Sequence, residues 1–373
     1  MTREYAFVCI ECGQRYAIDT RDWSCTCGGL FDFDHRPPFD TGLIDSAISG
    51  PWRYRATLPL EPDWEAVTLG EGNTSLVPIE WYGHRLVLKM EMASPTGCFK
   101  DRGATLLVTA LHGMGIQRVV EDSSGNAGAS LAAYAGRAGI RCEVCIPSSA
   151  SRAKLAQIEA YGAEVIEIRG KREYAALAAW AAAAHGAYYA SHVYSPYFSA
   201  GIETMAYELW EQLGRRAPDA LLMPVGNGSL LLGAYHGFLR LNQAGLAAKV
   251  PRLFAVQTAA CAPLFEAYRS GAHDIEAVSV EPTMASGIAI AHPARGSQIL
   301  EAVRATAGAV LRVSEDKIAQ TYHELACQGL YVEKTAAVPV AAVEGLAQLL
   351  GGDLPESVIV PLTGHGLKLH PGA

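Results

Sequence analysis

The chain has 373 residues, of which 50% are hydrophobic and 18% are charged, and this length has room for two or three folded domains. The formal net charge of −8 excludes the basic surface that nucleic-acid binding requires. No apolar run is long enough to span a membrane, and the polar start at Met1 lacks an apolar signal core. These features predict a globular cytoplasmic protein whose nine cysteines are reduced or metal-bound.

Four of the nine cysteines lie close together near the start of the chain. Cys9 and Cys12 form a Cys-x2-Cys-Gly knuckle, and Cys25 and Cys27 form a tighter Cys-x-Cys-Gly-Gly pair. Four thiolates suit a tetrahedral Zn²⁺ ion, and four protein ligands leave no open position for catalysis. Residues 1–35 are therefore predicted to form a four-cysteine, zinc-ribbon-like unit with a structural metal. A metal-free remnant of such a unit is the alternative.

Residues 36–85 are rich in Pro and Trp with little periodicity, which predicts an arm that wraps the main body. Beyond the arm, strand-like and helix-like segments alternate, which predicts an α/β fold with mostly parallel sheets. Strands are expected over residues 118–121, 142–146, 165–168, 220–224, 252–256 and 357–361. Apolar residues recur at three-and-four spacing over 202–213, which predicts a helix ending at Gly214. Cys142 and Cys145 lie on a predicted strand, where they face opposite ways and belong to the core rather than to a metal site.

Three short polar or glycine-rich segments follow predicted strands, at residues 123–126, 226–229 and 363–366. Ligands of parallel sheets bind at the carboxyl ends of the strands, so these segments are candidate binding loops. The loop 226–229 lacks both the lysine of a nucleotide P-loop and the third glycine of a dinucleotide fingerprint. It therefore suits a cofactor phosphate better than ATP or NAD; a plain tight turn is the alternative. Asn126 can bind a ring oxygen or cap the following helix.

Lys100 follows the Pro95-Thr96-Gly97 turn and precedes a predicted helix. A lysine amine forms an imine with an aldehyde only when it is unprotonated, which requires desolvation or neighbouring cations. Phe99 and Arg102 supply an apolar and a cationic neighbour. Thr363 can place a hydroxyl at a pyridine nitrogen without forcing its protonation. Taken alone, Lys100 is an ordinary surface lysine, but these partner motifs together predict a pyridoxal-phosphate site.

These four motifs, in this order, resemble the fold-type II pyridoxal-phosphate-dependent enzymes (the tryptophan synthase beta-like family), and among them the threonine synthase-like members. The resemblance extends over nearly the whole chain, with further matching stretches at residues 70–74, 154–163, 225–233, 329–333 and 361–368. It implies two three-layer domains with parallel sheets and the cofactor in the cleft between them. The large domain is expected to comprise residues 86–117 and 200–373, and a small mobile α/β domain residues 118–199.

The resemblance also implies the roles of individual residues. Lys100 forms the imine with pyridoxal 5′-phosphate, Asn126 binds the ring oxygen and Thr363 binds the ring nitrogen. The phosphate is held by Gly226, Asn227, Gly228, Ser229 and Leu230. The amino-acid substrate is expected to contact Thr96, Ser123, Ser124, His192 and Phe198. The implied protein is a carbon–oxygen lyase, often a homodimer, which carries out elimination and replacement at the β or γ carbon of a small amino acid.

The segment that reads the substrate departs from the family pattern. Threonine synthases that act on phosphohomoserine carry an Asn-Ser pair and an arginine where this chain has His192-Val193 and Phe198. The change removes a bidentate phosphate clamp, although Lys334 offers another positive charge. It predicts a paralogue acting on an unphosphorylated substrate: a threonine or serine dehydratase, a diaminopropionate lyase or a cysteate-synthase-like β-replacement enzyme. Threonine synthase itself stays open, and the alternative of another class is a non-catalytic cofactor-binding regulatory protein.

Overall fold

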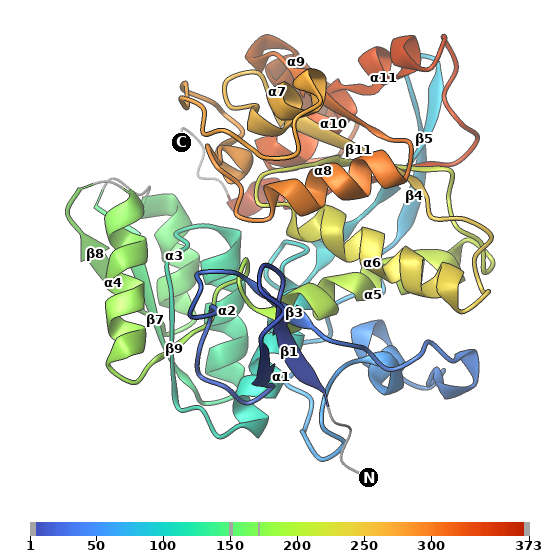
Figure 1. Ribbon diagram of the computed structural model, residues 1–373. Coiled ribbons are helices and arrows are strands. Elements are labelled where there is room, and N and C mark those ends of the chain that lie inside the picture. Colours follow the sequence, from blue (N-terminus) through green and yellow to red (C-terminus); the bar gives the residue numbers. More distant parts are fainter. Residues whose placement is uncertain (1–4, 149–151, 171, 369–373) are drawn as a thin grey trace. The chain divides into compact units, whose positions relative to one another are not determined.

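The computed structural model describes residues 5–148, 152–170 and 172–368. Two compact units share the chain (Figure 1). Unit 1 comprises Met1–Gly72, Lys100–Thr204 and Lys368–Ala373, and unit 2 comprises Asn73–Phe99 and Met205–Leu367. None of the helices in the described part of the chain has both the length and the apolar character needed to cross a membrane.

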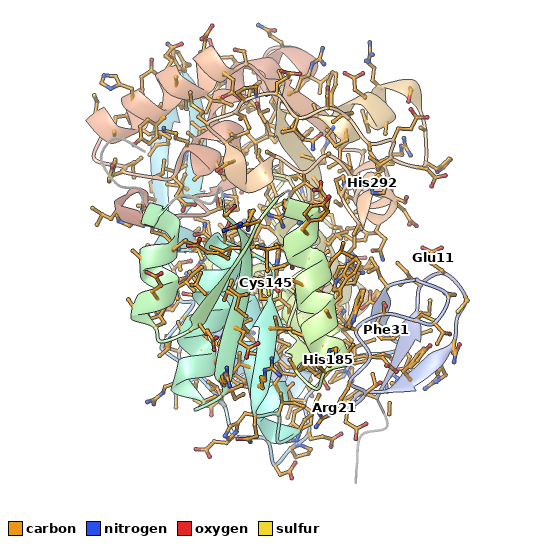
Figure 2. All side chains as sticks on the ribbon, turned by 90° about the vertical axis from the view of Figure 1, so that its left-hand side faces the viewer. Glu11, Arg21, Phe31, Cys145, His185 and His292 are labelled. Atoms are coloured by element: carbon orange, nitrogen blue, oxygen red, sulfur yellow. The ribbon has the colours of Figure 1, made fainter. Side chains whose placement is uncertain are left out.

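Unit 1 contains a four-stranded parallel sheet in the order β8-β7-β6-β9. Its strands are β6 (Arg118–Glu121), β7 (Arg141–Pro147), β8 (Glu164–Ile168) and β9 (Tyr188–Tyr189), and they are connected by α2 (Asn126–Arg137), α3 (Arg152–Ala160) and α4 (Arg172–Ala184). Parallel crossovers are right-handed. Because the connection through α4 runs back across the sheet to its other edge, α4 covers the face opposite α2 and α3. The sheet consequently lies between helices (Figure 2).

The sheet interior contains the two cysteines that the sequence assigns to the core. Cys142 and Cys145 are 5% and 1% exposed on β7, which confirms that prediction. Helices cover both faces of this central strand, so residues that point opposite ways are both buried. Figure 2 shows Cys145 among the strands of this sheet.

Unit 1 also holds the N-terminal part of the chain. β1 (Ala6–Cys9), β2 (Arg15–Ala17) and β3 (Phe31–Phe33) form a separate antiparallel sheet in the order β2-β1-β3. We call residues 5–35 the four-cysteine unit. The short 3₁₀ helices η1 (Thr41–Leu43) and η2 (Gly50–Thr57) follow it. Trp52 then fixes this stretch on unit 1, because its buried indole N–H is shared between Glu71 at 3.0 Å and Thr105 at 3.1 Å.

Unit 2 contains a six-stranded sheet in the order β12-β11-β10-β13-β5-β4. The strands are β4 (Leu76–Trp81), β5 (His84–Lys89), β10 (Ala220–Pro224), β11 (Arg252–Thr258), β12 (Ala309–Val313) and β13 (Val358–Pro361). Neighbours are parallel except β4 and β5, which agrees with the expectation of mostly parallel sheets. Tyr82 and Gly83 have φ values of 48° and 78°. Two left-handed residues form the kind of tight turn that joins antiparallel strands.

Helices cover both faces of the six-stranded sheet (Figure 1). Three helices pack with β11 and β12: α6 (Ser229–Gln243), α7 (Pro263–Ser270) and α8 (Gly296–Ala305). Helices α9 (Glu315–Cys327) and α10 (Lys334–Ala341) pack against each other, and α10 also packs against β10, β11 and β13. The short helix α11 (Val343–Leu349) follows α10. Short 3₁₀ turns lie at η3 (Glu91–Ala93), η4 (Ser286–Ile288) and η5 (Gly366–Lys368). α1 (Asp101–Gly113) belongs to unit 1, and α5 (Pro196–Gln212) begins in unit 1 and ends in unit 2. The predicted helix ending at Gly214 is thus confirmed.

Candidate functional site

Lys100 lies at the start of α1 in unit 1, as the sequence predicts. Its backbone is already helical, with φ −58° and ψ −23°, and Asp101 is the first residue of the helix. The Lys100 Nζ atom lies 5.6 Å from the centroid of the Phe198 ring. Phe198 is only 2% exposed, and a Cβ atom at Gly103 would come within 2.6 Å of its ring. The lysine amine therefore has a fixed aromatic wall beside it, at a distance suited to a cation–π contact.

A buried acid–imidazole pair lies in the same unit. Glu121 ends β6, and His192 follows β9, the neighbouring parallel strand. His192 Nδ1 lies 2.8 Å from Glu121 Oε1, with side chains 11% and 1% exposed. Burial, reinforced by the charge of Asp122, raises the pKa of Glu121 well above its usual value. Burial, reinforced by the positive charges of Lys100 and Arg172, lowers the pKa of His192 well below its usual value.

His192, Phe198 and Lys100 form one cluster. The His192 and Phe198 rings meet edge to face, with centroids 6.0 Å apart. The sequence predicts both rings as substrate residues, and the structure brings both to the vicinity of the lysine. Glu121 was not among the predicted site residues, although an acidic residue at the end of an apolar strand is a signal that the sequence contains.

The loop 123–126 connects β6 to α2 and carries three of the predicted site residues. Gly125 is the N-cap residue and Asn126 is the first residue of the 12-residue helix, so Asn126 does not occupy the capping position. The Ser123 hydroxyl accepts a hydrogen bond from the backbone N–H of Gly125 at 3.4 Å. A Cβ atom at Gly128 would lie 2.0 Å from the Ser123 carbonyl oxygen. The loop therefore closes tightly on the helix, and Ser123 and Ser124 lie at a helix N-terminus, where anions are stabilised.

The glycine loop of unit 2 joins β10 to α6. Gly228 has φ +80° and is the N-cap residue of α6, a helix of 15 residues. A Cβ atom at Gly228 would lie 2.2 Å from Ile299 Cδ1, and one at Gly226 would lie 2.9 Å from Ile288 Cα. A plain turn accounts for Gly228, which requires a left-handed backbone. It does not account for Gly226, where close packing alone excludes a side chain. Loops of this kind expose backbone N–H groups to an anion at a helix N-terminus.

Thr363 follows β13 in unit 2 and is 5% exposed. The backbone N–H of Phe99, the residue before the candidate lysine, donates to the Thr363 carbonyl oxygen at 3.2 Å. Cys98 and Gly364 form an antiparallel bridge beside that hydrogen bond. The predicted substrate residue Thr96 is buried nearby, with its hydroxyl 3.4 Å from Cys98 Sγ. The peptide that leads into the lysine is thus paired with the segment that carries Thr363.

The four N-terminal cysteines converge in the four-cysteine unit. The Sγ atoms of Cys9, Cys12, Cys25 and Cys27 all lie within 4.8 Å of one another. Cys9 and Cys27 are 3.5 Å apart and Cys12 and Cys25 are 3.6 Å apart, well beyond the length of a disulfide bond. The Tyr16 hydroxyl donates to Cys25 Sγ at 3.1 Å, and this bond lowers the pKa of Cys25 to about 6. Four converging sulfur atoms are the donor set that suits a tetrahedral zinc ion.

The four-cysteine unit packs on α4 and on the segment that runs from β9 into the first turn of α5. Trp23 stacks on Trp180 of α4 with centroids 5.0 Å apart, and the edges of Tyr189 and Tyr194 meet it at 5.2 and 4.9 Å. The Tyr197 hydroxyl donates to a backbone carbonyl of the four-cysteine unit at 3.3 Å, and its ring contacts two phenylalanines there. Aromatic residues of the four-cysteine unit therefore support the segment that carries the two rings beside the lysine.

Comparisons with known proteins identify the family. Residues 67–364 match the family described as pyridoxal-phosphate dependent enzyme. The threonine synthase of Methanocaldococcus jannaschii is 32% identical over 376 residues, covering 96% of this chain and 92% of the relative. The threonine synthase of Mycobacterium bovis is 36% identical over 338 residues, covering 87% of this chain and 91% of the relative.

Solved structures share the fold. A T.th. threonine deaminase superposes with a TM-score of 0.67 and 28% identity, covering 78% of this chain and 90% of that one. Maize serine racemase superposes with a TM-score of 0.69 at 22% identity, covering 79% and 88%, and supports the fold alone. These matches confirm the resemblance carried by the sequence motifs: the chain belongs to the pyridoxal-phosphate dependent enzymes of fold type II, as a threonine synthase-like member.

Proposed function

We propose that this protein is a pyridoxal-phosphate-dependent lyase or synthase acting on a small amino acid, with Lys100 as its catalytic residue. The observation that carries the proposal is the position of Lys100 at the start of α1, with its amine beside the buried ring of Phe198. When bound, the cofactor supplies an electron sink for the Cα carbon of the substrate. Lys100 holds the cofactor covalently, then accepts the Cα proton and returns it, as anchor, base and acid in turn.

The chain has residues suited to each part of the cofactor. The glycine loop at the start of α6 suits the phosphate, because a left-handed Gly228 and the close packing of Gly226 leave no room for side chains. We assign the ring nitrogen to Thr363 and the ring oxygen to Asn126. A hydroxyl partner does not force the nitrogen to be protonated, so it favours elimination and replacement over transamination.

We assign the substrate carboxylate to the loop before α2. Ser123 and Ser124 offer hydroxyl groups at the N-terminus of this 12-residue helix, where the helix dipole favours negative charge. Thr96 is the further substrate residue in this assignment.

Two substrate classes compete within this function. Similarity to threonine synthases favours phosphohomoserine and the threonine synthase reaction. The buried Phe198 at the position of the family arginine favours an unphosphorylated amino acid, as in a hydroxy-amino-acid dehydratase, a diaminopropionate lyase or a cysteate-forming synthase. We favour the second class, because the ring packs closely against Gly103 and a phenyl group cannot clamp a phosphate.

We further propose that the four-cysteine unit binds one structural Zn²⁺ through Cys9, Cys12, Cys25 and Cys27, supported by their converging sulfur atoms. The proposal also includes a homodimer in the cytoplasm that binds a small amino acid and neither nucleic acid nor a membrane. The acidic net charge and the family resemblance support this part of the proposal.

The test is the visible spectrum of the purified protein, recorded while amino acids are added one at a time. We expect a cofactor band at roughly 410–430 nm in the wild type that is absent, together with turnover, in Lys100→Ala. Lys249→Ala is the matched control, since that half-exposed side chain pairs with Asp219 on the surface. A band or turnover that persists in Lys100→Ala would refute the role of Lys100. A band that no amino acid changes would favour the non-catalytic alternative.

A further inference from the structure

Glu121 holds the ring of His192 by one nitrogen and leaves the other nitrogen unoccupied. Glu121 Oε1 lies 2.8 Å from His192 Nδ1, and the two side chains are 1% and 11% exposed. The second ring nitrogen, Nε2, has no hydrogen-bond partner in the described part of the chain, and it is not among the fully buried polar atoms that lack one. Nε2 therefore keeps accessible surface on the side of the ring that points away from Glu121, where a ligand can reach it.

The open nitrogen belongs to the cluster that contains the candidate lysine. The ring of His192 and the Nζ atom of Lys100 lie 6.0 Å and 5.6 Å from the centroid of the same Phe198 ring. Strands β6 and β9, which lead to Glu121 and His192, are parallel neighbours, and ligands of such sheets bind at the carboxyl ends of the strands. A substrate whose Cα proton is taken by Lys100 therefore brings its Cβ substituent to this cluster, because the two carbons are directly bonded.

The surroundings of the pair favour a proton on the Glu121 carboxyl group. Its second oxygen, Oε2, is sealed from solvent and has no hydrogen-bond partner among the described residues, which costs less on a neutral carboxyl than on a carboxylate. Burial and the charge of Asp122 raise the pKa of Glu121 and outweigh the attraction of Arg172 and Lys100, whereas burial and the same two cations lower the pKa of His192. In the neutral pair the carboxyl O–H donates to Nδ1, so the hydrogen of the ring is on Nε2.

We propose that His192 is the catalytic acid that protonates the leaving hydroxyl of a hydroxy-amino acid, with Glu121 as the positioning residue that orients the ring and supplies the replacement proton. This inference rests on the proposed function and names the substrate class of the same site. Lys100 takes the Cα proton, and the electron pair of that bond forms the Cα–Cβ double bond. The Cβ–O bond breaks, its electron pair stays on the oxygen, and the oxygen takes the Nε2 proton and leaves as water.

The ring of His192 stays neutral throughout this step. Nδ1 takes the proton of Glu121 as Nε2 gives up its own, so the imidazole changes tautomer and Glu121 becomes a carboxylate. The proton that Lys100 has gained balances this new negative charge, and exchange with solvent restores both groups. Hydroxide is a poor leaving group at neutral pH, and a positioned acid accelerates such a step by about 10²–10⁴-fold.

The decisive experiment compares leaving groups. The hydroxyl of L-serine or L-threonine needs a proton to leave, whereas the chloride of β-chloro-L-alanine leaves without one. We would measure initial rates of 2-oxo acid formation from all three by the cofactor-loaded protein, and we expect the wild type to eliminate water from L-serine or L-threonine. His192→Phe should lower kcat for that substrate at least about 100-fold and change kcat for β-chloro-L-alanine by less than about threefold.

Glu121→Gln separates the supply of the proton from the position of the ring. The amide donates a hydrogen bond to Nδ1 and keeps the ring in place, but it gives up no proton. We expect kcat for the hydroxylated substrate to fall about as far as in His192→Phe, with KM and chloride elimination close to those of the wild type. Glu164→Gln, an exposed carboxylate of β8, is the control that should leave all rates unchanged. Circular dichroism checks the fold of each variant, and His192→Phe carries the test if Glu121→Gln does not fold.

Nuclear magnetic resonance tests the pair without turnover. In the cofactor-loaded protein with ¹⁵N-labelled histidine, the signals absent from His192→Phe belong to that ring. We expect them to show a neutral imidazole with its hydrogen on Nε2 in the wild type and in Glu121→Gln.

Four results would overturn the inference: no elimination of water by the wild type, equal loss of water and chloride elimination in His192→Phe, full kcat in either variant of the pair, or a ring hydrogen on Nδ1. In each case an absorbance response to amino acids or the elimination of chloride by the wild type still supports the proposed function. A wild type that binds the cofactor but neither responds to any amino acid nor eliminates chloride would instead defeat the proposed function itself.

Discussion

Replacing Trp23 with alanine tests whether the four-cysteine unit is a structural part of unit 1. The indole of Trp23 stacks on Trp180 and meets the edges of Tyr189 and Tyr194, with centroid distances of 5.0, 5.2 and 4.9 Å. Trp23→Ala removes all three contacts and leaves the four cysteines in place. It therefore separates the packing of the four-cysteine unit from its metal chemistry.

The expected loss of stability follows from these contacts. Each aromatic pair contributes about 0.5–1.5 kcal/mol beyond the area it buries, so three pairs sum to about 1.5–4.5 kcal/mol. Fully buried Trp→Ala changes cost about 3–5 kcal/mol. Trp23 is only partly buried, so we expect the free energy of unfolding of unit 1 to fall by about 2–3 kcal/mol.

Urea unfolding followed by circular dichroism measures this change. Leu177→Ala is the matched control, because Leu177 lies on the same helix as Trp180 but is 53% exposed. Surface changes of this kind alter stability by about 0.5 kcal/mol or less. If Trp23→Ala also changed the free energy of unfolding by less than that, the four-cysteine unit would not be held by these rings, and the reasoning would be refuted.

Three further predictions concern other parts of the chain. Lys89→Met should lower the free energy of unfolding by about 3–5 kcal/mol, because it leaves the buried Glu208 carboxylate without its ion-pair partner. Urea unfolding should show that this free energy partly recovers when Glu208 is also changed to Met. No recovery in the double variant would argue against the ion pair. Gly228→Ala should weaken cofactor binding at least about tenfold, because φ is +80° and the added Cβ would lie 2.2 Å from Ile299; unchanged retention of the cofactor on dialysis would contradict this. Native mass spectrometry should detect one zinc ion per chain in the wild type and less in Cys12→Ser, and a metal-free wild type would disprove the zinc proposal.

Six strands of the two larger sheets, β6, β7, β8, β10, β11 and β13, were predictable because each is a short apolar run that ends at a glycine or polar loop. Strand 220–224, for example, is confirmed at both ends as β10. The hairpin of β4 and β5 was missed because Pro78 interrupts the pattern of β4. Proline removes a hydrogen-bond donor and is tolerated on edge strands, and β4 is the edge strand of its sheet. The low strand propensity of proline at Pro78 argues against a strand, but the edge of the sheet tolerates a strand that contains it.

The candidate site was predictable only in part for a related reason. Lys100 and the glycine loop have local signatures, since a turn before a helix and a strand before glycines are visible in a few consecutive residues. The Glu121–His192 bond joins residues 71 positions apart. It exists because β6 and β9 are neighbours although β7 and β8 lie between them in the sequence. Strand order depends on the whole sheet, so the sequence showed two separate residues where the structure shows one pair.

The segment that runs from the end of β9 into the first turn of α5 has two functions that its sequence alone does not separate. Tyr194 and Tyr197 contact the four-cysteine unit, whereas His192 and Phe198 lie in the cluster with Lys100. Lys100 itself is the N-cap residue of α1, outside that segment. Loosening the four-cysteine unit, by removing its metal or by Trp23→Ala, should therefore disturb substrate binding before it disturbs cofactor attachment. A variant that kept its visible absorbance while losing its preference among amino acids would have the pattern that this arrangement requires.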